Sequence, residues 1–195
     1  MNVNTPSLFV PHGVYDIFNF DQLLRHDVAA EFPSINDTDF TVLFFGHIET
    51  RKGILEFLAS SQLLHSVESV KFIVAGGSTL DVHAKKEFDA YRNNQNILLH
   101  DHRIAMEDVQ KYFTLSDVVV LPYLEGTTSG VLKLAMAFDK PIIATDVGDF
   151  SETLLDWPGI LIKTGDVAQE ISNAVISLKE NYASHMQKLN KNKKN

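Results

Sequence analysis

The sequence contains no cysteine, so it can form neither a disulfide bond nor a thiolate metal site. It also lacks an uninterrupted apolar run of the roughly 18 residues that a membrane-spanning helix requires. The first residues show no signal-peptide pattern of a charged segment followed by an apolar one. These absences favour a cytoplasmic protein whose contact with a membrane is at most peripheral.

Basic residues are in the minority. The chain has 17 Lys and Arg against 25 Asp and Glu, which gives a net charge of −8. Nucleic-acid binding needs a basic face that displaces counterions, so this charge balance argues against it. Four of the lysines lie in residues 184–195, which we expect to form a flexible basic tail.

Apolar residues are abundant, at 45% of 195 residues, and they occur in short continuous runs separated by helical patterns. Continuous runs are typical of strands covered on both faces, and strand–helix alternation predicts a parallel sheet. Residues 39–183 are therefore expected to form an α/β domain with a Rossmann-like, doubly wound parallel sheet of about six strands. The expected strands are Val42–Gly46, Lys71–Ala75, Asn96–His100, Asp117–Leu121, Pro141–Thr145 and Ile160–Ile162. The expected helices are Gly53–His65, Leu80–Asn93, Met106–Leu115, Ser129–Phe138, Phe150–Leu155 and Asp166–Tyr182.

Two loops of this predicted sheet could hold a phosphate group. In a doubly wound sheet, ligands bind at the carboxyl ends of the strands where the strand order reverses, here Gly46–Gly53 and Leu121–Gly130. The first loop carries Arg51 and Lys52, whose charges would neutralise a diphosphate. The second leads into a helix at Ser129, and a helix start offers unpaired amides and a favourable dipole to an anion.

Simpler readings exist for each of these features. An isolated Arg-Lys pair before a helix is usually solvated, and its position opposite a second phosphate-type loop is what favours binding here. Thr127 or Thr128 could cap the helix, which is compatible with phosphate binding.

Two other patterns are weaker. His100 and His102 form an H-x-H pair that could bind a transition metal, but no third ligand is apparent, so a polar loop explains them better. Gly76 and Gly77 are not followed by a G-x-G-x-x-G pattern, so we expect no NAD or FAD.

Four segments occur in an order that is similar to one family. They read FTVLFFGHIETRKG (40–53), KFIVAGG (71–77), SDVVVLPY (116–123) and AMAFDKPIIATDVG (135–148). This order resembles the donor-binding, C-terminal half of the group 1 nucleotide-sugar glycosyltransferases, which have the two-domain GT-B fold. The resemblance implies a retaining enzyme that moves a hexose-type sugar from a nucleoside diphosphate sugar to an acceptor, without a bound metal or cofactor.

The resemblance also assigns parts of the chain. Residues 1–38 correspond to an interdomain linker strand and leading helix, so the N-terminal domain that binds an acceptor sugar or lipid-linked glycan would be missing. We therefore expect no sugar transfer by this chain alone. The residues expected to contact the donor or its diphosphate are Gly46, His47, Arg51, Lys52, Arg103, Glu125, Thr127, Thr128, Ser129, Gly130 and Val131.

Several positions depart from the family pattern. His47 stands where the family commonly has an arginine, and Gly126 and Leu134 align with two glutamates that contact the sugar and the ribose. Glu125 lies one residue earlier and could replace the first of them. The string TTSGV resembles a subgroup that has Thr-Gln-Ser-Gly-Val instead. The alternative function is a degenerate, non-catalytic GT-B-like domain that binds a phosphorylated ligand or a protein partner.

Overall fold

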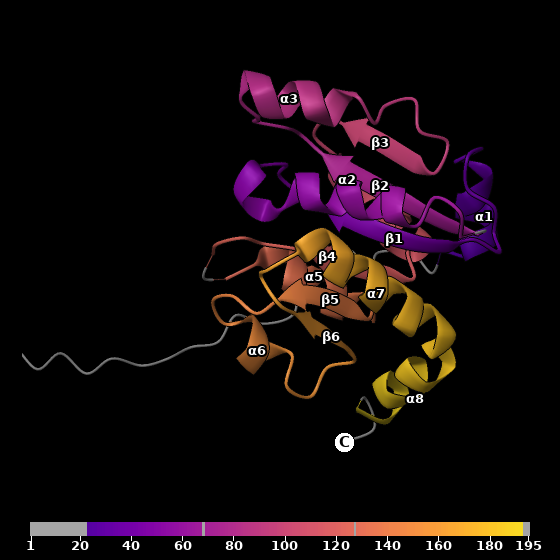
Figure 1. The fold of residues 1–195 in the computed structure, drawn as a ribbon. Coiled ribbons are helices and arrows are strands. Elements are labelled where there is room, and N and C mark those ends of the chain that lie inside the picture. Colours follow the sequence, from indigo (N-terminus) through magenta and orange to yellow (C-terminus); the bar gives the residue numbers. More distant parts are fainter. Residues whose placement is uncertain (1–22, 68, 127, 193–195) are drawn as a thin grey trace, which may run out of the picture.

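The computed structural model describes residues 23–67, 69–126 and 128–192. These residues build one parallel sheet of six strands in the order β3-β2-β1-β4-β5-β6, with β3 and β6 at its edges (Figure 1). The order reverses between β1 and β4, as the sequence predicts. The strands are β1 (Phe40–Phe45), β2 (Val70–Gly76), β3 (Ile97–Asp101), β4 (Val118–Leu121), β5 (Ile142–Thr145) and β6 (Gly159–Ile162).

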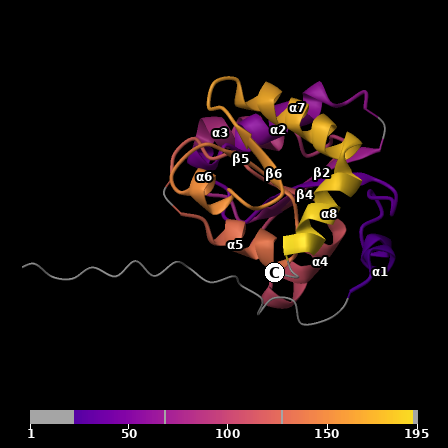
Figure 2. The ribbon, with the colours of Figure 1, turned by 90° about the horizontal axis from the view of Figure 1, so that it is seen from below.

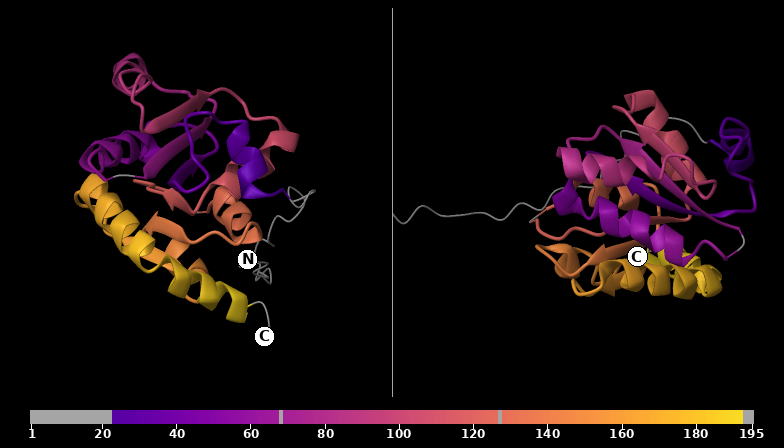
Figure 3. Two further views of the ribbon diagram at one scale, coloured as in Figure 1. Left: turned by 90° about the vertical axis from the view of Figure 1, so that its right-hand side faces the viewer. Right: turned by 45° about the horizontal axis from the view of Figure 1, so that its top comes forward.

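Helices cover both faces of the sheet (Figures 2 and 3). Those that pack on one face are α2 (Ile54–Leu63), α3 (Val82–Asp89) and α7 (Val167–Glu180). The opposite face carries α1 (Arg25–Ala30), α4 (Met106–Leu115), α5 (Gly130–Ala137) and the short α6 (Phe150–Thr153). A 3-10 turn, η1 (Thr50–Lys52), follows β1, and α8 (Tyr182–Asn192) follows α7.

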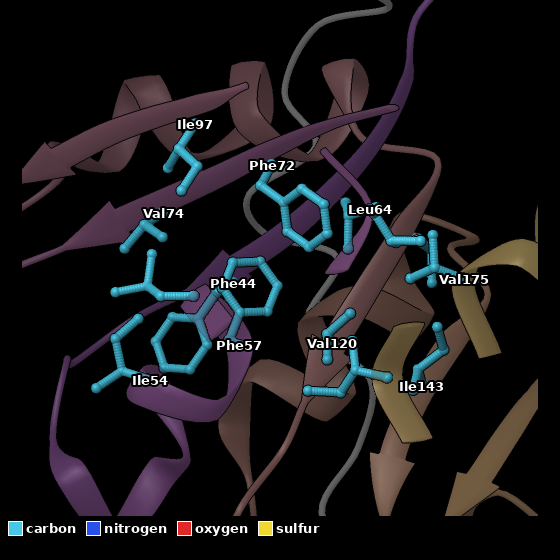
Figure 4. Packing of buried hydrophobic residues seen from close by; sticks show 14 of the residues in the cluster. Phe44, Ile54, Phe57, Leu64, Phe72, Val74, Ile97, Val120, Ile143 and Val175 are labelled. Carbon is cyan, nitrogen blue, oxygen red and sulfur yellow. The ribbon is translucent and has the colours of Figure 1, made fainter. Parts of the chain in front are cut away.

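The core is built from the continuous apolar strands. Alternate residues of β1 point to opposite faces, so that Phe44 packs beneath α2 while Leu43 lies in the cluster under α4 and α5. Phe57 of α2 contacts both Phe44 and Phe72, with ring centroids 5.5 and 5.3 Å apart, respectively (Figure 4). Burial on both faces fixes the sheet, and with it the edge at which the strands' carboxyl ends meet.

A polar network lies at the opposite end of the strands, where the strands begin. Arg25 of α1 forms an ion pair with Asp117 at 3.2 Å and donates hydrogen bonds to the carbonyls of Leu115 and Asp39. Asp117 also accepts the Thr41 amide at 2.7 Å. The network attaches α1 to the starts of β1 and β4.

Two expectations concern the ends of the chain. The predicted linker strand lies outside the described residues, and the leading helix is confined to α1. Residues 184–192, expected as a flexible tail, instead belong to α8, because Leu189 finds a buried position with 2% exposure. None of the helices in the described part of the chain combines the length and the hydropathy that crossing a bilayer requires.

Candidate functional site

The loop after β1 packs closely against the loop after β4. Gly53 has a φ of 71°, and a Cβ atom there would lie 1.9 Å from the carbonyl oxygen of Pro122. The backbone of Leu124 donates a hydrogen bond to the carbonyl of Arg51 at 2.9 Å. The close backbone approach requires a glycine at position 53.

Tyr123 connects the lysine loop with the start of α5. The Lys52 ammonium lies 5.7 Å from the centroid of the Tyr123 ring, and the Tyr123 hydroxyl lies 3.1 Å from the Ser129 hydroxyl. Ser129 is the N-cap of α5 and accepts the amide of Leu132 at 3.2 Å. The amides of the first turn that have no partner within the helix, beginning at Gly130, therefore start next to the lysine loop.

The side chain of Val131 completes this junction. Its Cγ2 atom lies 3.0 Å from the position that a Cβ would take at Gly46, whose φ is 98°. The carboxyl ends of β1 and β4 and the start of α5 thus form one continuous surface.

Charge at this surface is partly desolvated. Lys52 is half-buried, and its burial lowers the pKa of the ammonium, although the Glu49 carboxylate acts in the opposite direction. Burial also raises the pKa of the Tyr123 hydroxyl, which therefore stays protonated at neutral pH. An incoming anion would compensate the Lys52 ammonium for the solvation that it loses on burial.

Glu49 already pairs with two of the expected phosphate ligands. Its carboxylate lies 2.5 Å from the Arg51 guanidinium and 3.3 Å from Nε2 of His47. The same imidazole nitrogen is 2.9 Å from the Thr79 hydroxyl. His47 and Arg51 are thereby fixed over the loops that follow β1 and β2.

A hollow of about 500 Å³ lies beside this cluster, over the ends of β1 and β2. Gly76 lets the ends of β1 and β2 approach closely beside it, because a Cβ there would lie 1.8 Å from the carbonyl oxygen of Gly46. The turn that follows β2 beside this hollow is held by Asp101, which accepts the Ser78 amide at 3.0 Å. Residues lining the hollow include Phe45, Gly46, His47, Gly77, Arg103 and Ile104.

The expected site residues are only partly assembled. Gly46, His47 and Arg103 line the hollow, and Lys52, Ser129 and Val131 meet through Tyr123 and Gly46. Gly130 begins α5, and Arg51 pairs with Glu49. Glu125 and Thr128 are exposed on the loop before α5, while Thr127 lies outside the described residues. Their roles in binding remain predictions.

His100 takes part in packing. Its Nδ1 lies 2.7 Å from the Tyr112 hydroxyl, and its ring lies against Phe32 at 6.0 Å between centroids. In the described ranges, no group of three or more His, Asp and Glu side chains is placed to hold a metal ion.

Sequence reasoning missed Tyr123 and Glu49 as parts of the site. Tyr123 was visible as the end of the apolar run SDVVVLPY, but nothing in the sequence shows that its hydroxyl reaches Ser129. Glu49 has an extended backbone before η1, and only the three-dimensional turn brings its carboxylate to Arg51 and His47.

Several solved structures share this architecture. The C-terminal domain of a glycosyl transferase group 1 family protein, LpcC from Francisella tularensis, superimposes with a TM-score of 0.75 at 19% identity, covering 91% of this chain and 93% of that one. Sucrose-phosphate synthase from Thermosynechococcus elongatus gives 0.71 at 20% identity, covering 92% of this chain and 47% of that one.

Anabaena HepE in complex with UDP-glucose gives a TM-score of 0.68 at 16% identity, over 84% of this chain and 45% of that one. The chain therefore spans about half the length of the synthase and of HepE. No curated protein matches the sequence significantly. The profile of the family described as glycosyl transferases group 1 matches residues 39–181. With this match and a six-stranded sheet like that of the C-terminal GT-B domain, the chain belongs to the group 1 glycosyl transferases.

Proposed function

We propose that this domain binds the nucleotide-sugar donor of a glycosyltransferase that moves a hexose-type sugar to an acceptor, with retention at the sugar's anomeric carbon. The diphosphate would lie between Lys52 and the first amides of α5. The base would occupy the hollow beside Arg103, and the acceptor would come from a second domain.

One observation carries this proposal: a half-buried cation faces a helix start through one tyrosine. Lys52 lies over Tyr123, and Tyr123 reaches the Ser129 cap of α5. A cation and a set of helix amides that point to the same place bind a phosphate from two sides. Burial leaves the Lys52 ammonium partly desolvated, with the Glu49 carboxylate as its opposing charge, so a phosphate group at this place would add to its stabilisation.

The same arrangement supports sugar transfer. As the bond between the sugar and the diphosphate breaks, negative charge grows on the leaving oxygen. Lys52 and the α5 amides are fixed before the reaction, so they would stabilise that charge without reorganising. HepE was crystallised with UDP-glucose, which makes UDP the first nucleotide to test.

Recognition of the ribose and sugar hydroxyls needs other groups. Leu134, at the position of the family's ribose-binding glutamate, is buried in the core beneath α5 and cannot contact a ligand. Glu125 is exposed on the loop before α5 and is free to approach the sugar. We propose that Glu125, one residue before the position of the family's first glutamate, accepts a sugar hydroxyl.

Substitution of Lys52 tests the proposal. Lys52→Ala should weaken the binding of UDP and of inorganic pyrophosphate by about 1–3 kcal/mol, the range for losing a charge-assisted hydrogen bond. Lys133→Ala removes the same charge from α5 beyond its first turn and is the matched control. Binding would be measured by titration calorimetry, with unfolding curves to verify the fold. Equal affinities for the parent and Lys52→Ala would place the diphosphate elsewhere.

The alternative is a non-catalytic domain that binds a phosphorylated ligand or a protein. It is favoured by Gly126 and Leu134, which replace the family's two carboxylates. A melting screen separates the two functions. A nucleoside diphosphate at 100 times its dissociation constant adds about 2.7 kcal/mol of stability, whereas a domain without a nucleotide site shows no shift.

A further inference from the structure

A carboxylate lies among the basic side chains that face the candidate phosphate site. Glu49 follows β1, and its side chain is 24% exposed. Arg51 approaches it at 2.5 Å and His47 at 3.3 Å. The same carboxylate raises the pKa of Lys52, in opposition to burial, which lowers it. An anionic ligand and Glu49 would therefore compete for the same positive charge.

No capping role explains the carboxylate of Glu49. Glu49 is the N-cap of η1, yet its side chain accepts no capping hydrogen bond. Its Oε2 atom is shielded from water and lies 2.5 Å from the Arg51 guanidinium, in an ion pair without hydrogen-bond geometry. The guanidinium charge compensates this shielded oxygen, so the site holds the Glu49 carboxylate in place mainly by charge.

We infer that Glu49 is an internal competitor of the donor diphosphate, which holds Arg51 until the ligand displaces it. This inference rests on the proposed binding of a nucleoside diphosphate at this site. Arg51 has a planar fork that suits two phosphate oxygens as well as it suits a carboxylate, so the exchange replaces one pair by another. The affinity for the diphosphate is then set by the difference between the two pairs.

The competition also explains why Lys52 and Arg51 differ. Lys52 lies over Tyr123, next to the start of α5, where the proposed diphosphate would bind. Arg51 is half-exposed and is turned to Glu49. We therefore assign Lys52 to binding and Glu49, through Arg51, to setting how tightly the ligand is held. Glu49 is in this sense a positioning residue, since it acts through Arg51.

Glu49→Gln tests the inference, because the amide keeps the size of the side chain and removes its charge. We expect Glu49→Gln to bind inorganic pyrophosphate and UDP about fivefold more tightly than the parent, the scale of one partly exposed ion pair. Glu180→Gln, at the exposed end of α7 beyond the opposite edge of the sheet, changes the net charge equally and should leave both affinities unchanged.

A second pair of variants tests whether Arg51 is the link. In the Arg51→Ala background, the gain from Glu49→Gln should fall to less than half, because the competed cation is gone. An undiminished gain would show that Glu49 acts by general repulsion and would overturn the inference. Unfolding curves of each unliganded variant verify that the fold is kept.

The remaining outcomes are also distinguishable. If Glu49→Gln binds UDP more weakly but pyrophosphate equally, Glu49 accepts a ribose hydroxyl and the competition is refuted. If both affinities stay at the parent value while Lys52→Ala loses binding, the proposed function stands and this inference fails. If neither the parent nor Glu49→Gln binds pyrophosphate or UDP, both proposals fail.

Discussion

Replacing Gly53 by alanine isolates the contact that joins the two loops of the site. The backbone at Gly53 is left-handed, with φ at 71°, and the added Cβ would meet the Pro122 carbonyl oxygen at 1.9 Å, whereas ordinary contact begins near 3.4 Å. A left-handed residue with a Cβ costs about 1–2 kcal/mol, and the clash with backbone forces the loops apart at a further cost of about 1–3 kcal/mol. We expect Gly53→Ala to lose about 3 kcal/mol of unfolding free energy.

Urea unfolding of purified variants measures this loss. Gly165→Ala is the matched control, since a Cβ there meets nothing within 4 Å, and it should stay within about 0.5 kcal/mol of the parent. Gly159→Ala adds a clash of 2.1 Å with the Ile142 carbonyl, without a left-handed φ, and should fall between the other two. If Gly53→Ala were as stable as Gly165→Ala, the loops after β1 and β4 would not be in the contact described.

Two further predictions concern charge and capping. Burial lowers the pKa of Lys140 to about 8 in the folded protein. Above pH 8 the unfolded chain therefore binds more protons than the folded protein does. Raising the pH from 7 to 9.5 should stabilise the parent relative to Lys140→Met by about 2 kcal/mol. Lys86→Met, on the exposed side of α3, should show no such trend, and a pH-independent difference for Lys140→Met would refute the assignment. Ser129→Ala removes the α5 cap and the partner of the Tyr123 hydroxyl, so it should cost about 1–2 kcal/mol of stability in thermal unfolding. Ser177→Ala, at an exposed position, should cost almost nothing. Equal losses for the two variants would show that the cap contributes little.

The strands were predictable because each is a short apolar run with nothing polar to interrupt it. Continuous burial of Val118–Leu121 and Ile142–Thr145 follows directly from their sequence, and their alternation with helices leaves few topologies. Helix ends were less certain: the pattern Leu80–Asn93 shortens to α3, because Asp81 caps the helix by accepting the amides of His83 and Ala84.

The site was predictable as two loops but not as a set of contacts. The glycines and cations mark the loops, because backbone approach and charge leave a record in residue type. The pairing of Arg51 with Glu49 leaves none, since it depends on the turn from the extended Glu49 into η1. The helix α8 was not predicted, because the lysines of the tail hide Leu189, which is buried.

The attachment of α1 by Arg25 has a consequence for how the domain opens. A helix of six residues is too short to persist alone in water, and α1 is held by its packing and by the guanidinium that reaches the carbonyls of Leu115 and Asp39. Its amides should therefore exchange with solvent deuterium at the rate of β1 and β4, as one cooperative unit, and not at the rate of a fraying end. The first helix of the domain then reports on the integrity of the sheet that carries the site.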